Sequence, residues 1–228
     1  MSALQLAIFD CDGVLVDSEI IAAEVEAEML TEFGFEFTAG ELGARFAGLT
    51  WGAIVKRLEE ETGRAFPDDF AGKVEAAVKE RIGREVQAVP GVHAMLDLVD
   101  LPRCICSNSA TSLLQLELKR VDLWDRFRPY VFSAVEVGSK APKPAPDVFL
   151  HACREFEVDP GAAIVIEDSV HGVHAAIAAG CRVVGFTGGK HTWAGHADAL
   201  TEAGAETVIG RLADYPATVE ALSLWRGD

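Results

Sequence analysis

The chain has 228 residues, half of them apolar or aromatic, which is enough to bury the core of one large domain or of a core domain with a smaller companion. Its formal charge of −16 argues against a nucleic-acid partner, because binding a polyanion requires a basic surface. Five cysteines without metal-ligand spacing indicate a reducing compartment, and no apolar run approaches the ~18 residues of a membrane span. We therefore expect a cytoplasmic protein without a membrane partner.

The first predicted element is a strand over residues 4–9, and two carboxylates follow it. An apolar run that ends in Asp10, Asp12 and Gly13 is typical of a buried parallel strand that delivers acidic groups to the carboxyl edge of a sheet. Open α/β sheets bind their ligands at that edge. Two carboxylates so close together repel each other unless positive charge lies between them, so the pair indicates a site for a hard metal ion.

The next segment, from about residue 18 to residue 84, is predicted to be helical. Its apolar residues recur three and four positions apart, as they do on the buried face of an amphipathic helix. Gly34, Gly48 and the stretch 63–67 separate the predicted helices. The spacing therefore predicts a small helical bundle.

From Pro90 onward, short β-branched runs alternate with amphipathic stretches, which is the pattern of βαβ units in a parallel sheet. The predicted strands cover residues 103–106, 130–133, 163–166, 182–186 and 207–209. The strand at residues 4–9 belongs with them, although the helical segment lies between. The predicted fold is therefore α/β, with a doubly wound parallel sheet formed by residues 1–16 and 87–228. Residues 17–86 are inserted into it as an α-helical cap domain.

Polar residues in three later segments are expected to meet the first two carboxylates, because parallel strands bring their carboxyl ends to the same edge. These residues are Ser107 with Asn108, Lys143 in a Lys-Pro-Ala-Pro-Asp stretch, and Glu167 with Asp168. The acidic pair suits the oxygen shell of a metal ion. The serine or asparagine can donate a hydrogen bond to an anion, and the lysine can balance its charge.

With these segments in this order, the chain resembles the haloacid dehalogenase superfamily, in its branch of phosphatases and phosphoglucomutase-like enzymes with a helical cap. The resemblance covers the whole chain and rests on four motifs. It implies an aspartate nucleophile, a general acid and base, groups that hold the phosphoryl group, and a Mg²⁺ site. By this resemblance, Asp10 is the nucleophile and Asp12 is the general acid and base. Ser107, Asn108 and Lys143 hold the phosphoryl group. The Mg²⁺ site is formed by Asp10, Asp12 (through its carbonyl), Glu167 and Asp168.

Physical reasons for these residue types can be given independently of the resemblance. An aspartate nucleophile needs no deprotonation at neutral pH, and an aspartyl phosphate divides one difficult displacement into two easier ones. Asp12, freed from strand geometry by Gly13, can protonate the leaving alcohol and then deprotonate the incoming water. Mg²⁺ prefers oxygen ligands and neutralises charge between nucleophile and phosphate.

Some of these residues also have simpler interpretations. Ser107 and Asn108 could cap a helix that starts near Ala110, and Asp168 or Ser169 could cap the helix that follows them. Four histidines are interpreted as ordinary surface or packing residues, because no further cluster of ligand-type residues accompanies them. They are His171, His174, His191 and His196.

Within the superfamily, the sequence favours a phosphatase. β-Phosphoglucomutases carry a cap histidine and a cap arginine where this chain has Ala22 and Trp51, and dehalogenases lack the acid that Asp12 supplies. The Asp-Cys-Asp-Gly segment at residues 10–13, the segment 17–19 and the cap segment 45–48 most resemble bacterial sugar-phosphate phosphatases, including 6-phosphogluconate phosphatases. The resemblance therefore implies a small phosphorylated metabolite, a sugar or sugar acid, as the partner.

Other functions stay open at this point. A phosphosugar mutase is the alternative within the superfamily, and a phospho-acceptor signalling module or a metabolite-binding protein is the alternative from another class. A signalling module must keep its phosphoryl group for a time, so an acid-base group beside the nucleophile and a water-excluding lid would not serve it. The sequence leaves the oligomeric state undecided.

Overall fold

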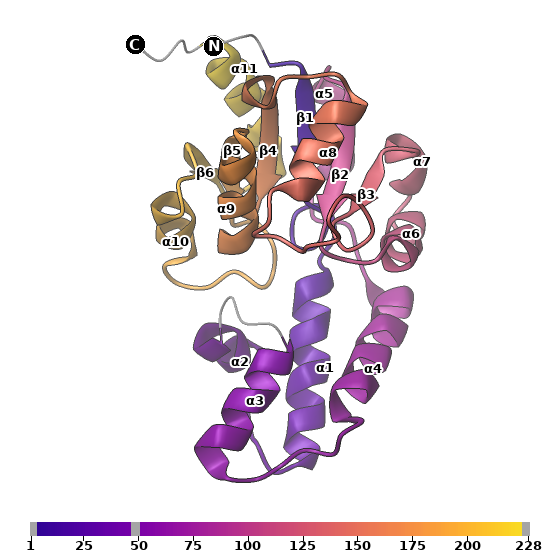
Figure 1. The fold of residues 1–228 in the computed structure, drawn as a ribbon, viewed down its shortest axis with the longest axis vertical. Helices are drawn as coiled ribbons and strands as arrows, with labels where there is room; N and C mark the ends of the chain where they lie inside the picture. The colour runs from indigo at the N-terminus through magenta and orange to yellow at the C-terminus, as the bar shows by residue number, and fades with distance from the viewer. Residues whose placement is uncertain (1–3, 47–50, 225–228) are drawn as a thin grey trace.

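The computed structural model describes residues 4–46 and 51–224, which form a layered α/β part and a separate bundle of helices (Figure 1). Ala47 and Gly48, which belong to the segment compared with sugar-phosphate phosphatases, lie outside the described residues. Within the described ranges, no helix is both long and apolar enough to cross a membrane.

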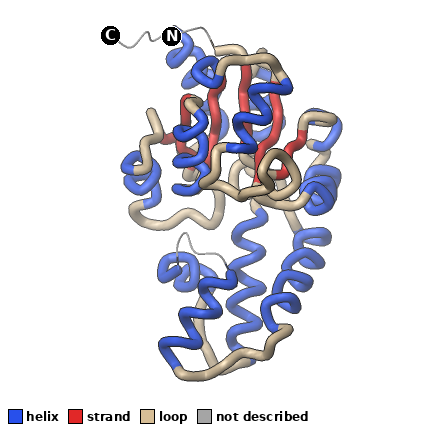
Figure 2. Tube along the Cα trace, viewed as in Figure 1, coloured by secondary structure: helices blue, strands red, loops and turns tan. Residues whose placement is uncertain are grey.

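A six-stranded parallel sheet organises the α/β part. Its strands are red in Figure 2, and their order, labelled in Figure 1, is β3-β2-β1-β4-β5-β6. The strands are β1 (Leu6–Phe9), β2 (Arg103–Ser107), β3 (Val131–Ser133), β4 (Ala163–Glu167), β5 (Arg182–Phe186) and β6 (Thr207–Ile209). The first strand of the chain pairs with β2 on one side and β4 on the other. β1 therefore ends where the strand order changes direction, which is where open α/β sheets place their ligand sites.

Helices cover both faces of this sheet. They are α5 (Val92–Leu98), α6 (Thr111–Arg120), α7 (Trp124–Phe127), α8 (Asp147–Glu155), α9 (Val170–Ala179), α10 (His196–Glu202) and α11 (Tyr215–Leu224), with the 3₁₀ turns η1 (Pro160–Ala162) and η2 (Leu212–Asp214). Ala7 and Phe9 of β1 belong to a core cluster shared with α5, α6, α7 and α11. Leu6 and Ile8 belong to a second cluster, shared with α8, α9 and α10. Because both faces are buried, β1 is apolar throughout, and the predicted doubly wound α/β fold is confirmed.

The bundle consists, among the described residues, of α1 (Ser18–Glu32), α2 (Ala39–Phe46), α3 (Trp51–Thr62) and α4 (Phe70–Glu85). It has a core of its own, in which the rings of Phe66 and Phe70 stack with centroids 4.6 Å apart. α4 also contacts the α/β part, because a Cβ on Gly83 would lie 3.0 Å from the side chain of Leu116 in α6.

The chain passes between the two parts twice, and the two passages bind each other. The backbone N–H of Asp17 donates to the carbonyl of Gln87 at 2.9 Å, and that of Val89 donates to the carbonyl of Leu15 at 3.0 Å. The bundle is therefore joined to the sheet by two short, hydrogen-bonded segments that begin just beyond the carboxyl end of β1.

Candidate active site

The carboxyl end of β1 holds the first two aspartates. The N–H of Asp10 donates to the carbonyl of Ile166 at 3.0 Å, which keeps the buried Asp10 beside the end of β4. The chain then turns at Gly13, whose φ is 79°, a conformation that side chains other than glycine rarely adopt. A Cβ on Gly13 would lie 1.8 Å from Oδ2 of Asp168. Glycine at this position therefore lets the β1 turn approach the acidic end of β4.

Lys143 lies at the centre of the site. Its Nζ donates to Oδ1 of Asp10 at 2.6 Å, to the carbonyl of Cys106 at 2.7 Å and to Oε1 of Glu167 at 2.5 Å. The ring of Phe149 lies beneath the ammonium, 5.1 Å away. An ammonium group has three protons to donate, so each proton of Lys143 has an acceptor.

The carboxyl end of β4 supplies the second acidic pair. Glu167 is fully buried, and its second oxygen accepts hydrogen bonds from the N–H and the hydroxyl of Ser169 at 3.3 and 3.0 Å. The carboxylate lies directly on the first turn of α9, because a Cβ on Gly172 would be 1.9 Å from it. Ser169 itself caps this helix by accepting from the N–H of Gly172. Asp168 is therefore not needed as the cap.

Asp12 accepts hydrogen bonds from three hydroxyl groups. Oδ1 accepts from Ser18 at 2.7 Å, and Oδ2 accepts from Ser107 at 3.0 Å and from Ser109 at 2.8 Å. Ser18 is the first residue of α1, so the helical bundle touches the site through this bond. Ser107 is predicted from the sequence as a site residue, whereas Ser109, two positions later, is not.

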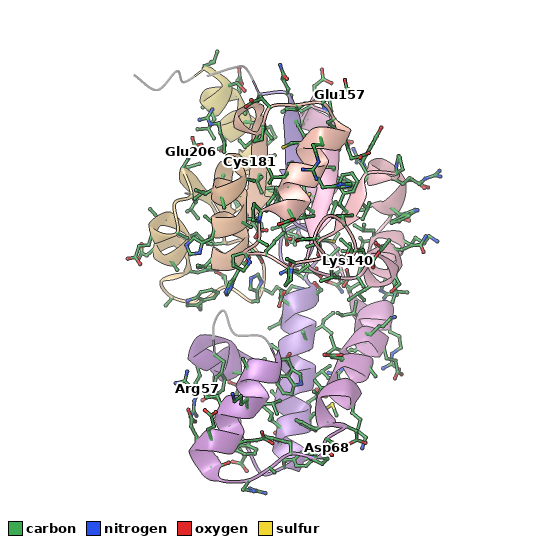
Figure 3. All side chains as sticks on the ribbon, viewed as in Figure 1. Arg57, Asp68, Lys140, Glu157, Cys181 and Glu206 are labelled. Carbon is green, nitrogen blue, oxygen red and sulfur yellow. The ribbon has the colours of Figure 1, made fainter. Side chains whose placement is uncertain are left out.

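Asn108 and Lys143 come together at the end of β2. Oδ1 of Asn108 accepts from the backbone N–H of Lys143 at 2.7 Å, and the Asn108 side chain is exposed. Neither Ser107 nor Asn108 caps α6, whose capping position is Ala110 and whose first N–H donates to Glu136 instead. The capping interpretation is therefore wrong. Lys140, on the same loop as Lys143, is exposed (Figure 3).

The site contains four carboxyl groups, those of Asp10, Asp12, Glu167 and Asp168, and one ammonium group, that of Lys143, which contacts two of them. Burial raises the pKa of the Asp10 carboxyl well above its ordinary value, and the charges of Glu167 and Asp168 add to this while Lys143 opposes it. For Lys143, burial alone would lower the pKa of the ammonium. The attraction of Asp10 and Glu167 outweighs burial, so the pKa lies above its ordinary value and Lys143 is charged at neutral pH.

The same crowding produces a group of oxygens that could hold a metal ion. Asp10, Glu167 and Asp168 are all buried, and each offers an oxygen that lies within 4.8 Å of the other two. A divalent cation with carboxylate ligands would relieve the repulsion among them. Of the residues predicted as metal ligands, these three are brought together.

Two histidines that the sequence analysis treated as ordinary surface or packing residues contact Asp168. Nε2 of His191 donates to Oδ2 of Asp168 at 3.0 Å, and Nε2 of His196 donates to its backbone carbonyl at 2.6 Å. Burial lowers the pKa of both imidazoles, so these are hydrogen bonds from neutral rings. The sequence contains one signal for these contacts with Asp168: both histidines follow β5, whose carboxyl end lies next to that of β4. His171 and His174 are exposed, as that interpretation allowed.

Glu117 of α6 is a further titratable group that the sequence analysis did not single out. It is fully buried, and neither of its carboxylate oxygens has a hydrogen-bond partner among the described residues. Burial raises its pKa to about 10, and the nearby charges of Asp12 and Glu19 add to the rise. Glu117 is therefore protonated at neutral pH.

Comparisons with known proteins identify relatives over most of the chain. The family model described as haloacid dehalogenase-like hydrolase matches residues 7–186. The chain is 30% identical over 192 residues to the 6-phosphogluconate phosphatase of Escherichia coli, with 84% of this chain and 86% of that protein covered. A solved haloacid dehalogenase-like protein of unknown function from Agrobacterium tumefaciens is 48% identical, with a TM-score of 0.93 over 96% of this chain and 99% of that one. A HAD family hydrolase from Deinococcus radiodurans, solved with bound phosphate and sodium, is 29% identical, with a TM-score of 0.84 and 100% of both chains covered.

Proposed function

Because the chain belongs to the haloacid dehalogenase-like hydrolase family, we propose that it is a Mg²⁺-dependent phosphatase acting on a small phosphomonoester, a sugar phosphate or sugar-acid phosphate, through an aspartyl phosphate. The observation that carries this proposal is that Lys143 contacts both Asp10 and Glu167 at the carboxyl edge of the sheet. At the same edge, oxygens of Asp10, Glu167 and Asp168 lie within 4.8 Å of one another. A 6-phosphogluconate phosphatase among the relatives supports the substrate class.

The donor set fits Mg²⁺. Asp10, Glu167, Asp168 and the backbone carbonyl of Asp12 would hold the ion, and all of these ligands are oxygens, which hard cations prefer. When bound, Mg²⁺ would neutralise charge between the nucleophile and the phosphoryl group.

The residues of the chain divide the reaction into two displacements. A carboxylate oxygen of Asp10 attacks phosphorus, the bond from phosphorus to the substrate oxygen breaks, and Asp12 gives the leaving oxygen its proton. Asp12 then takes a proton from a water molecule, which attacks the phosphorus and releases Asp10. Lys143, Ser107 and Asn108 hold the oxygens of the transferring group, whose charge must be balanced throughout.

We propose that residues 17–86 act as a cap over this site. The support is that α1 begins beside the acidic cluster, where Ser18 binds Asp12, and that the bundle is joined to the sheet by only two short connections among the described residues. A cap that opens for the substrate and closes to exclude water would protect the phosphoenzyme. It would also place residues of the bundle against the part of the substrate beyond the phosphate.

The test is phosphate release from a panel of phosphorylated sugars, sugar acids and nucleotides, with Mg²⁺ and with a chelator. We expect release from sugar-type substrates that stops on chelation and falls by at least about a thousandfold in Asp10→Asn, as when other covalent nucleophiles are removed. The matched control is Asp198→Asn, an exposed aspartate of α10. Full activity under chelation or in Asp10→Asn would contradict the proposal, and phosphate retained in an isomerised sugar phosphate would indicate a mutase.

A further inference from the structure

The loop that follows β5 contacts both the acidic site and the beginning of the helical bundle. The backbone N–H of Lys190 donates to Oδ1 of Asp17 at 3.0 Å, and its Nζ lies 3.6 Å from Oδ2. Asp17 is buried and immediately precedes α1. This loop, residues 187–195, is therefore fixed at Lys190 to the connection between the two parts of the molecule.

The next residue of the loop, His191, binds the carboxylate of Asp168 and has little room to move. A Cβ on Gly13 would lie 2.7 Å from Cε1 of the imidazole, and a Cβ on Gly189 would lie 2.8 Å from both Cε1 and Nδ1. Both distances are shorter than ordinary carbon contacts, so the ring lies directly against the backbone of two glycines. Its Nε2 is thereby held 3.0 Å from Oδ2 of Asp168.

His196, the first residue of α10, fixes the backbone of the same aspartate. Because the carbonyl of Asp168 can only accept, Nε2 of His196 carries the proton, and Nδ1 accepts from the hydroxyl of Thr192 at 2.9 Å. The indole of Trp193 stacks on the His196 ring with centroids 3.8 Å apart. The loop and the first residue of α10 therefore hold Asp168 at two points, one carboxylate oxygen and the carbonyl.

We propose that His191 is a positioning residue for the metal site: by donating to Oδ2 of Asp168, it turns the other carboxylate oxygen toward Asp10 and Glu167. This rests on the proposed function, because it assigns Asp168 to the metal. Groups that hydrogen-bond to metal ligands set ligand orientation, and their loss typically lowers metal affinity about 10- to 100-fold. Without this bond, the carboxylate of Asp168 would be free to rotate or to bind the metal ion through both oxygens, and its Oδ2 would lose a hydrogen-bond donor.

The test measures cation binding directly in the full chain, with Mn²⁺ as the probe and the free ion counted by electron paramagnetic resonance. We expect His191→Phe, which fills the space but donates nothing, to weaken binding about 10- to 100-fold. His191→Gln, whose amide nitrogen can take the place of Nε2, should restore most of the affinity. His174→Phe is the matched control, because His174 is exposed on α9, and its affinity should equal that of the wild type.

A purely structural role would give a different pattern. Phe and Gln variants would then differ in melting temperature but bind Mn²⁺ like the wild type, which would overturn the inference, as would equal weakening in both. Should His191→Phe not fold, Gly189→Ala provides a second test, because the added methyl group would lie 2.8 Å from the His191 ring and 2.8 Å from the carbonyl of Gly13, so the contact between the loop and Asp168 must shift. Unchanged Mn²⁺ affinity in Gly189→Ala would also overturn the inference.

A wild-type chain that binds no Mn²⁺ would overturn the proposed metal site together with this inference. Wild-type binding of Mn²⁺ with an unaffected affinity in His191→Phe would overturn the inference alone.

Discussion

Glu117 gives the sharpest quantitative prediction, because the structure encloses a carboxyl group that it does not pair. In the folded protein its pKa rises from the ordinary 4.5 to about 10, so the folded state keeps a proton that the unfolded chain releases as the pH passes 4.5. The stability that this proton contributes is complete below pH 4.5 and is lost progressively as the pH rises toward 10. Each pH unit costs about 1.4 kcal/mol, so the loss is about 3 kcal/mol near pH 7.

Glu117→Gln keeps the shape of the side chain and removes its titration. We therefore expect the variant to match the wild type near pH 4.5 and to exceed its free energy of unfolding by about 3 kcal/mol near pH 7. The measurement is urea unfolding at several pH values with a chelator present, because a bound cation would change the field at Glu117. Glu75→Gln, on the exposed side of α4, is the control and should show no such trend. A difference between Glu117→Gln and wild type that stays constant over this pH range would refute the reasoning.

The remaining predictions concern contacts within the site. Lys143→Met should lower the free energy of unfolding by about 3–5 kcal/mol at neutral pH, because it leaves two buried carboxylates without their counter-charge. Urea unfolding measures this, and a loss below about 1 kcal/mol would mean that solvent already screens the two carboxylates. Gly172→Ala should lower stability by about 1–3 kcal/mol or more and reduce activity, since the new Cβ would lie 1.9 Å from the carboxylate of Glu167. Gly52→Ala in α3 has no atom within 4 Å of the new Cβ and should instead raise the melting temperature slightly, so a destabilised Gly52→Ala would count against this use of the contacts.

The strands were predictable because of where they lie in the sheet. Buried on both faces, they are short apolar runs bounded by polar residues, and the predicted limits of β5 and β6 agree with the structure. The other predicted strands differ by one or two residues. β2 and β4 each extend one residue further, into Ser107 and Glu167, because backbone pairing continues past the apolar run. The motifs were predictable for a related reason, since parallel strands bring their carboxyl ends together whatever the separation in sequence.

The contacts that support the motif residues could not be predicted in the same way. His191 and Asp168 are separated by a helix and a strand, and their hydrogen bond depends on the course of an irregular loop and on two glycines that let the ring approach. Glu117 lies on the same face of α6 as the buried Leu114 and Leu118, but a glutamate is ordinarily expected to be exposed. It is buried where α6 packs against the core that also includes the β1 turn.

The bonding of Lys143 limits how the site can accept a phosphate. All three of its protons already have acceptors, two of them carboxylates, so the ammonium can contact a phosphoryl oxygen only by giving up one of these bonds. The carbonyl of Cys106 is the acceptor that costs least to release, because it is neutral whereas the other two are charged. Lys143 would then hold Asp10 and Glu167 in place while it turns toward the substrate. Four carboxyl groups lie near one ammonium group, so a dianionic phosphate would require further positive charge. A divalent cation held by Asp10, Glu167 and Asp168 would supply that charge.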